Sequence, residues 1–223
     1  TNIPNMPARS FIMPEPYGVC LVIGAWNYPY QLSFAPAIAA LAAGNTVILK
    51  PSELSAHTSA LMAELVNSSF DPGVFHVIEG GVPETTALLK KKFDKIFFTG
   101  SVPVGNIVYQ AAAKNLTPVT LELGGKSPAF VFADTNLDVT ARRLVWGKFL
   151  NAGQTYIAPD YVLVENKIKE KFLHAIKAQI DEFRYSFENK NHVQIINERN
   201  FDRLVNLIDH SKVIYGGEHE RDE

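Results

Sequence analysis

The sequence predicts an α/β protein built on a doubly wound parallel sheet. Short apolar runs alternate with helical patterns along most of the chain. Apolar runs without polar interruption are typical of strands that are covered on both faces. A regular alternation of strand and helix implies right-handed crossovers between parallel strands, with helices on both faces of the sheet.

The predicted strands follow from the apolar runs. The first, Val19–Ile23, reads Val-Cys-Leu-Val-Ile and has no polar residue. Further strands are predicted at 46–49, 74–78, 95–98, 118–121, 129–132 and 161–164. A last strand-like run, at 213–215, precedes a charged stretch.

The predicted helices lie between these strands, and local signals place their ends. Ser55 can cap a helix that carries Leu61 and Leu65 on one face. Gly44 follows an Ala-rich segment, as glycine commonly does at a helix C-terminus. Helices are predicted at 31–43, from Ser55, from Pro83-Glu84, and at 102–114, 137–150 and 167–183. Two apolar stripes at helical spacing predict core packing: Ile168, Phe172, Ile176 and Ile180, then Phe201, Leu204, Val205 and Ile208.

Composition excludes several functional classes. The 21 Lys and Arg residues against 23 Asp and Glu give a formal net charge of −2, which argues against attraction to nucleic acid or to an anionic membrane. No apolar run approaches the ~20 residues that span a bilayer, and no signal peptide is evident. A single cysteine favours a reducing, cytoplasmic location. The scattered histidines show no metal-ligand spacing, so we expect no metal site.

Polar residues follow two of the predicted strands. Strand 46–49 is followed by Lys50-Pro51-Ser52-Glu53, and strand 95–98 by Thr99-Gly100-Ser101, with Gly105 four residues later. Ligands of open α/β folds sit beyond the carboxyl ends of strands, where Lys and Glu can bind ribose hydroxyls and a Gly-Ser turn can bind phosphate. By spacing alone, a solvated Lys and Glu and an ordinary turn are the commoner alternatives.

Six blocks in fixed order make the pattern specific. They are Pro-Tyr-Gly at 16–18, Trp-Asn-Tyr-Pro at 26–29, Ala-Gly-Asn-Thr through Lys-Pro-Ser-Glu at 43–53, Phe-Thr-Gly-Ser at 98–101, Leu-Glu-Leu-Gly-Gly-Lys-Ser-Pro at 121–128, and Gly-Gln-Thr with Ala-Pro-Asp-Tyr at 153–161. In this order the chain resembles the aldehyde dehydrogenase superfamily. The Pro-Glu-Thr-Thr stretch and the Gln-Thr-x-x-Ala-Pro-Asp-Tyr stretch resemble its class 3 or fatty-aldehyde branch.

The resemblance implies a domain organisation. Residues 1–13 resemble an oligomerisation arm, which implies a homodimer; 14–124 resemble a Rossmann-like NAD-binding domain; and 125–223 resemble the beginning of a catalytic domain. A usual family member is about twice as long. Its C-terminal part carries a Glu that holds the nicotinamide ribose and loops that close the substrate funnel.

The resemblance also assigns roles in the oxidation of an aldehyde through a thioester. Asn27 matches the oxyanion-hole residue, since an amide NH₂ is a suitable donor to a developing negative charge. Glu122 matches the general base that activates water, and its apolar neighbours Leu121 and Leu123 could favour a base that works near neutral pH.

The remaining matches concern the cofactor. Lys50 and Glu53 match the adenosine-ribose ligands, and Glu53 should favour NAD by repelling a 2′-phosphate, although NADP stays possible because of Lys50. Val102 and Pro103 depart from the commoner residues after the pyrophosphate turn. The other residues matched to the cofactor site are Trp26, Gly100, Ser101, Gly105, Leu123 and Gly124.

The position of the nucleophile is the main departure. The family has Cys two residues after the Gln of Gly-Gln-Thr, and this sequence has Tyr156. A phenol, with a pKa of about 10 against about 8.5 for a thiol, is a far scarcer anion at neutral pH. Cys20 is expected to be a small buried hydrophobe. We therefore expect the chain to be inactive as written.

Three functions remain open from the sequence. The first is a portion of an NAD-dependent aldehyde dehydrogenase. The second is a non-catalytic relative that keeps cofactor or subunit contacts. The third, a different α/β enzyme on the same sheet, is remote because the six blocks occur in order.

Overall fold

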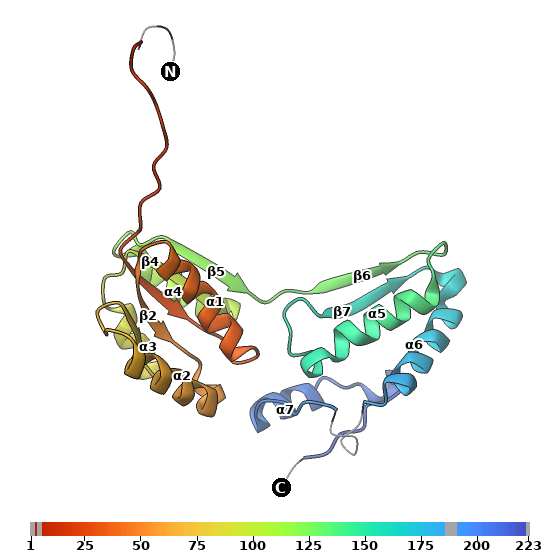
Figure 1. Ribbon diagram of the computed structural model, residues 1–223. Coiled ribbons are helices and arrows are strands. Elements are labelled where there is room, and N and C mark those ends of the chain that lie inside the picture. The colour runs from red at the N-terminus through yellow and green to blue at the C-terminus, as the bar shows by residue number, and fades with distance from the viewer. Residues whose placement is uncertain (1–2, 4–5, 186–190, 222–223) are drawn as a thin grey trace. The chain divides into compact units, whose positions relative to one another are not determined.

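The computed structural model describes residues 3, 6–185 and 191–221. The chain divides into two compact units, Thr1–Glu122 (unit 1) and Leu123–Glu223 (unit 2), which are drawn in Figure 1. This division falls two residues before the end of the predicted cofactor domain. The functional domains at 14–124 and 125–223 stay predictions.

Unit 1 is built on a five-stranded sheet of order β3-β2-β1-β4-β5. Its strands are β1 Val19–Ile23, β2 Thr46–Lys50, β3 Phe75–Val77, β4 Lys95–Gly100 and β5 Val119–Leu123. β1 pairs in parallel with both β2 and β4, and β2 with β3. The prediction of a parallel sheet around the first apolar runs is confirmed.

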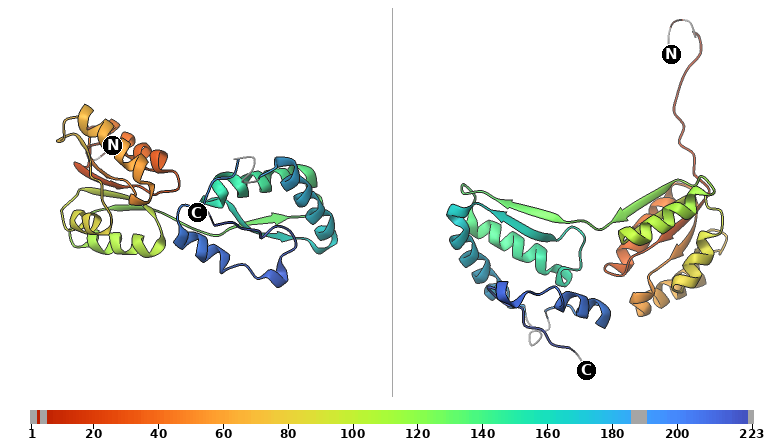
Figure 2. Two further views of the ribbon diagram at one scale, coloured as in Figure 1. Left: turned by 90° about the horizontal axis from the view of Figure 1, so that it is seen from below. Right: turned by 180° about the vertical axis from the view of Figure 1, so that it is seen from behind.

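Helices cover both faces of this sheet. They are α1 Pro29–Ala42, α2 Ala56–Ser69, α3 Val82–Leu89 and α4 Val102–Ala113. α1 and α2 contact each other on one face, and α3 and α4 contact each other on the opposite face, as Figure 2 shows. The unit is therefore doubly wound, as the alternation of strand and helix predicts.

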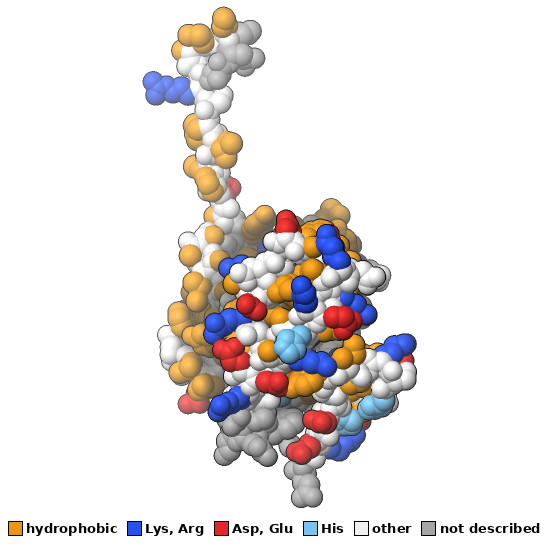
Figure 3. Space-filling model, turned by 90° about the vertical axis from the view of Figure 1, so that its right-hand side faces the viewer, with side chains coloured by type: hydrophobic (Ala, Val, Ile, Leu, Met, Phe, Trp, Pro, Cys, Tyr) orange, Lys and Arg blue, Asp and Glu red, His pale blue; other side chains and the backbone are white. Residues whose placement is uncertain are grey.

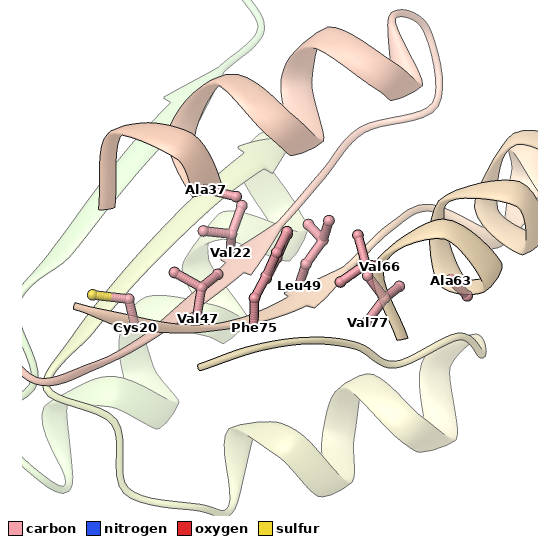
Figure 4. Packing of buried hydrophobic residues seen from close by; sticks show 9 residues of the cluster. All are labelled: Cys20, Val22, Ala37, Val47, Leu49, Ala63, Val66, Phe75 and Val77. Atoms are coloured by element: carbon pink, nitrogen blue, oxygen red, sulfur yellow. The ribbon is translucent and has the colours of Figure 1, made fainter. Parts of the chain in front are cut away.

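The core of unit 1 lies between the sheet and the pair α1 and α2 (Figure 4). Alternate residues of β1, Cys20 and Val22, point to this face. Ala63 and Val66 of α2 pack here, and Met62 of the same helix is also buried. Leu61 and Leu65 share a face as predicted, but that face is exposed.

Unit 2 contains a smaller two-stranded parallel sheet. β6 Ser127–Val131 pairs with β7 Pro159–Val164. The helices are α5 Leu137–Phe149, α6 Lys169–Phe183 and α7 Glu198–Val205. α5 contacts both β7 and α6. Of the stripe predicted on α6, Phe172 is buried, while Ile168, Ile176 and Ile180 are half-buried.

Two segments near the ends of the described chain contain no strand. The run 213–215 is not a strand, because no neighbouring strand among the described residues offers it a ladder. Residues 8–17 form neither helix nor strand, and Phe11, Ile12 and Met13 there are 80%, 97% and 67% exposed. Figure 3 shows the hydrophobic side chains along this N-terminal segment.

Across the described residues, we find no helix with the length and apolarity needed to cross a bilayer.

Candidate active site

The carboxyl ends of three neighbouring strands bring the predicted residues of unit 1 together. Ile23, at the end of β1, is paired with Lys50 of β2 on one side and with Phe98 of β4 on the other. The chain crosses from one face of the sheet to the other between β1 and β4. Such a switch point is where open α/β sheets bind ligands.

Lys50 is the most deeply buried charged residue of this edge. Its side chain is 2% exposed. The Nζ atom donates to the Pro51 carbonyl at 2.5 Å, to the Gly80 carbonyl at 2.6 Å and to Glu53 Oε2 at 3.2 Å. An ammonium has three N–H donors, so these acceptors match its full capacity. The alternative of a solvated lysine, which spacing alone favours, is wrong.

Glu53 places a carboxylate at the surface beside this ammonium. It begins a 3₁₀ turn, Glu53–Ser55, after β2, and the Ser52 hydroxyl stabilises that turn by accepting from the Leu54 N–H at 3.3 Å. The Glu53 side chain is 47% exposed. One of the two charges is thus fixed in the protein, and the other is accessible to a ligand.

Trp26 and Asn27 lie in the short connection from β1 to α1, and both are half-buried. The connection is held at its start, where the Gly24 N–H donates to the Lys50 carbonyl at 3.0 Å. A Cβ on Gly24 would lie 2.3 Å from Ser33 Oγ of α1. Only glycine permits this close approach of helix and strand.

The turn from β4 into α4 has the geometry of an anion site. Ser101 is the N-cap residue of α4, and its side chain makes no capping hydrogen bond. A Cβ on Gly100 would lie 2.4 Å from the Phe98 ring, and the N–H of buried Gly105 donates to the Ser101 carbonyl at 2.9 Å. Helix N-termini favour phosphate. Pro103, in the first turn, has no N–H and leaves one donor fewer.

A buried hydroxyl adds to the polar character of this edge. Thr99, 3% exposed, precedes Gly100 at the end of β4. Its Oγ1 atom has no hydrogen-bond partner among the described residues. The hydroxyl, the buried ammonium and the helix N-terminus offer donors and the accessible carboxylate offers an acceptor, a combination that fits a pyrophosphate and the hydroxyls of a ribose.

Tyr156 and Gly124 lie together in unit 2. A Cβ on Gly124 would lie 3.9 Å from Tyr156 Cδ1, so the ring is beside the glycine backbone. Tyr156 is half-buried, and burial raises the pKa of its phenol. The phenolate is therefore even scarcer at neutral pH than that of an exposed tyrosine. Leu123, which precedes Gly124, is half-buried.

The loop before Tyr156 has an unusual backbone. Asn151, Ala152 and Gly153 all have positive φ, at 52°, 53° and 72°. The Gln154 side chain donates to the Asn151 carbonyl at 3.1 Å and accepts from the Ile196 N–H at 3.1 Å. Left-handed conformations in non-glycine residues cost energy and persist only where surrounding contacts hold them. The Gln of the Gly-Gln-Thr block therefore ties this loop to the segment before α7.

Unit 2 contains an ion pair that was not predicted from the sequence. Lys126 Nζ lies 2.7 Å from Asp160 Oδ2 and holds the pKa of that carboxyl below its usual range. The two residues come together because Ser127 pairs with Pro159 at the start of the small sheet. Lys126 lies in the block at 121–128 and Asp160 in the block at 153–161, and this is the feature of the sequence from which the pair could have been predicted.

Glu122 closes unit 1 and is exposed. The apolar shielding expected from Leu121 and Leu123 is absent, because alternate residues of β5 point to opposite faces. Leu121 and Leu123 are half-buried instead. The structure thus brings together the strand-end residues of unit 1 and, within unit 2, Gly124 and Tyr156.

Other reactive groups do not replace the predicted residues. Cys20 is 4% exposed inside β1, and burial raises the pKa of its thiol. Among the described His, Cys, Asp and Glu side chains, no group of three could hold a metal ion. A cavity of about 230 Å³ in unit 2, lined by residues of 192–201 and by Glu220 and Arg221, contains none of the predicted site residues.

Comparison with known proteins identifies one family. The model described as "Aldehyde dehydrogenase family" matches residues 1–223. The mouse "Aldehyde dehydrogenase, dimeric NADP-preferring" is 53% identical over 209 residues, which are 93% of this chain and 46% of the relative. "Aldehyde dehydrogenase family 3 member A2" of Pongo abelii is 49% identical over 219 residues, 97% of this chain and 45% of the relative. The chain spans about half the length of these curated relatives.

Solved structures agree with these sequence matches. A Staphylococcus aureus AldH in a substrate-bound state has a TM-score of 0.95 and 44% identity, and the match covers 99% of this chain and 49% of that one. A Mycobacterium tuberculosis aldehyde dehydrogenase complexed with NAD⁺ has a TM-score of 0.78 and 32% identity, with 86% and 41% covered.

Proposed function

This chain belongs to the aldehyde dehydrogenase family, and on that premise we propose that it carries the cofactor site of an NAD(P)-dependent aldehyde dehydrogenase. The substrate is a small-molecule aldehyde and the product a carboxylic acid. The bound nicotinamide supplies the hydride acceptor.

The proposal is supported by one observation: the residues matched to the adenosine ribose and to the pyrophosphate follow β2 and β4, the two strands that pair in parallel with β1 at the switch point of the sheet. Lys50 and Glu53 bind the adenosine ribose from the end of β2. Gly100, Ser101 and the first turn of α4 bind the pyrophosphate from the end of β4. Trp26 and Gly105 are the other residues of unit 1 that are matched to the cofactor.

The catalytic groups act on the aldehyde carbon. Asn27 donates its amide N–H to the oxyanion that forms when a thiolate attacks the carbonyl. Glu122 accepts a proton from the water that hydrolyses the thioester. A thiolate at position 156 is required for both roles.

Tyr156 makes the chain inactive as written. Its phenol has a raised pKa and forms almost no anion at neutral pH. Its ring lies beside Gly124 and occupies volume that a cysteine side chain leaves open to the aldehyde. The second candidate function follows from the same observation: a protein that binds the dinucleotide, or another subunit, without oxidation.

Assembly and location complete the proposal. The exposed Phe11, Ile12 and Met13 support a homodimer formed through the N-terminal arm, because an extended apolar segment gains by pairing with a second copy. The mouse relative is itself named as dimeric. The lone, buried Cys20 supports a cytoplasmic, reducing location.

A cofactor titration tests the proposal. The fluorescence of NADH is followed as the chain is added, with NAD⁺ and then NADP⁺ as competitors. We expect saturable binding that either dinucleotide reverses. Aldehyde added with NAD⁺ should produce no NADH. A chain that binds neither dinucleotide contradicts both candidate cofactor functions.

A further inference from the structure

We propose that Glu84 is a positioning residue of the dinucleotide site: its carboxylate fixes the Gly80–Gly81 turn, whose carbonyl in turn fixes the Lys50 ammonium. This inference rests on the proposed function, because the orientation of Lys50 affects binding only if the ribose lies beside it. Glu84 itself contacts neither substrate nor cofactor in this account.

The first link is a capping interaction. Gly81 is the N-cap residue of α3, and Glu84 is the third residue of that helix. Glu84 Oε2 accepts from the Gly81 N–H at 2.8 Å. A Glu or Gln at this position commonly satisfies the N-cap N–H.

The second link is the packing of Glu84 on Gly80. Gly80 has φ of +130°, and a Cβ there would lie 2.4 Å from Glu84 Cγ and 2.6 Å from Oε2. The side chain therefore lies directly against the Gly80 backbone. Two consecutive glycines have wide conformational freedom, so this contact and the cap restrict a turn that would otherwise be mobile.

The third link runs from the turn to the strand end. The Gly80 carbonyl accepts from Lys50 Nζ at 2.6 Å, across 30 positions of sequence. With the Pro51 carbonyl at 2.5 Å, it holds two of the three ammonium protons. The contact to Glu53, at 3.2 Å and half-exposed, is the longest. A ribose hydroxyl can share that contact while the two carbonyls keep the ammonium in place.

Four variants of the chain test the inference in NADH titrations. In E84A the acceptor is lost, and in E84D the carboxylate is one methylene too short to reach the Gly81 N–H. For both variants we expect the Kd for NADH to rise about fivefold. Binding must then order the released turn, at a cost close to the free energy of one capping hydrogen bond. E84Q keeps an oxygen acceptor on the same stem and should stay within about twofold.

T86A is the matched control. Thr86 is exposed on the same helix, and its hydroxyl donates to the Val82 carbonyl at 2.7 Å. Its loss removes a side-chain bond from the first turns of α3 without touching the Gly80–Gly81 turn. We expect an unchanged Kd. Thermal unfolding of each variant shows that the compared proteins are folded.

The outcomes separate the inference from the function on which it rests. If the unaltered chain binds NADH and the E84A and E84D variants bind it equally well, the inference is overturned and the proposed function stands. If E84Q or T86A loses as much affinity for NADH as E84A does, Glu84 has a structural role only, and the inference is overturned. If the unaltered chain binds no NADH, the proposed function fails, and the inference fails with it.

Discussion

At the scale of single residues, the edge of the unit 1 sheet separates a fixed charge from an accessible one. Lys50 is enclosed by carbonyl groups, and Glu53 reaches solvent beside it. The 3.2 Å contact between them partly neutralises the carboxylate. We therefore expect Glu53 to discriminate against a 2′-phosphate less strongly than an isolated carboxylate would.

The substitution E53Q tests the contribution of this charge. Removing the carboxylate removes repulsion of the 2′-phosphate, so the affinity for NADP⁺ relative to NAD⁺ should rise on the order of tenfold. The ratio is measured by competition against NADH. E64Q, an exposed carboxylate on α2, is the matched control and should leave the ratio unchanged. A preference of the unaltered chain for NADP⁺ would contradict the predicted choice of NAD.

Tyr156 predicts a pH dependence of stability. Burial raises the pKa of the Tyr156 phenol in the folded protein above its value in the unfolded chain. The contribution of the neutral phenol to the free energy of unfolding is therefore fully present below about pH 10 and is lost as the pH rises through the pKa of the folded protein. In Y156F this loss is absent. Melting temperatures of the two proteins should therefore diverge in alkali, with Y156F the higher, relative to their difference at neutral pH. Parallel curves would show that the ring is solvated.

At the scale of elements, one side chain ties α2 to the edge strand β3. The Asn67 amide donates to the Val77 carbonyl at 3.0 Å, and its oxygen accepts from the Val77 N–H at 2.9 Å. β3 is the outer strand of the sheet. The amide thus substitutes for the hydrogen bonds that a further strand would provide.

N67A should lower the free energy of unfolding of unit 1 by about 1–3 kcal/mol, because the backbone N–H and carbonyl of buried Val77 lose their hydrogen bonds to the Asn67 side chain. Chemical denaturation followed by circular dichroism measures the effect. S68A removes only an exposed hydroxyl that donates to the Leu65 carbonyl at 3.4 Å, so it should change stability by much less. Equal effects of the two substitutions would show that the amide does not support β3.

The elements also show what the sequence can predict. β1 was predictable to the residue because a continuous apolar run marks a buried parallel strand. The run 213–215 has the same local character but no neighbouring strand among the described residues, which local pattern cannot reveal. The same limit applies to the candidate site. Motifs place Lys50 and Glu53 at a strand end, but no local pattern predicts that the Gly80 carbonyl, 30 positions away, accepts a hydrogen bond from Lys50.

At the scale of the whole molecule, the exposed N-terminal arm predicts the assembly. Phe11 and Ile12 are 80% and 97% exposed, so they contribute little to the stability of one chain. The double substitution F11S/I12S should convert a dimer into a monomer and leave the melting temperature of the monomer unchanged. Light scattering over a range of concentrations measures the mass. A monomeric unaltered chain contradicts the proposed homodimer.

The substitution Y156C tests the central claim, that this chain has the family's site without its nucleophile. It is compared with the unaltered sequence, both in the 223-residue chain and in a chimera that continues it with the C-terminal part of the mouse relative. The measurement is aldehyde-dependent production of NADH. Loss of a nucleophile costs many powers of ten, and misplacing reacting groups by ~1 Å costs ~100-fold. We therefore predict turnover only in the chimera with Y156C. NADH production by the unaltered chain, or full activity of Y156C without the added part, would contradict the account.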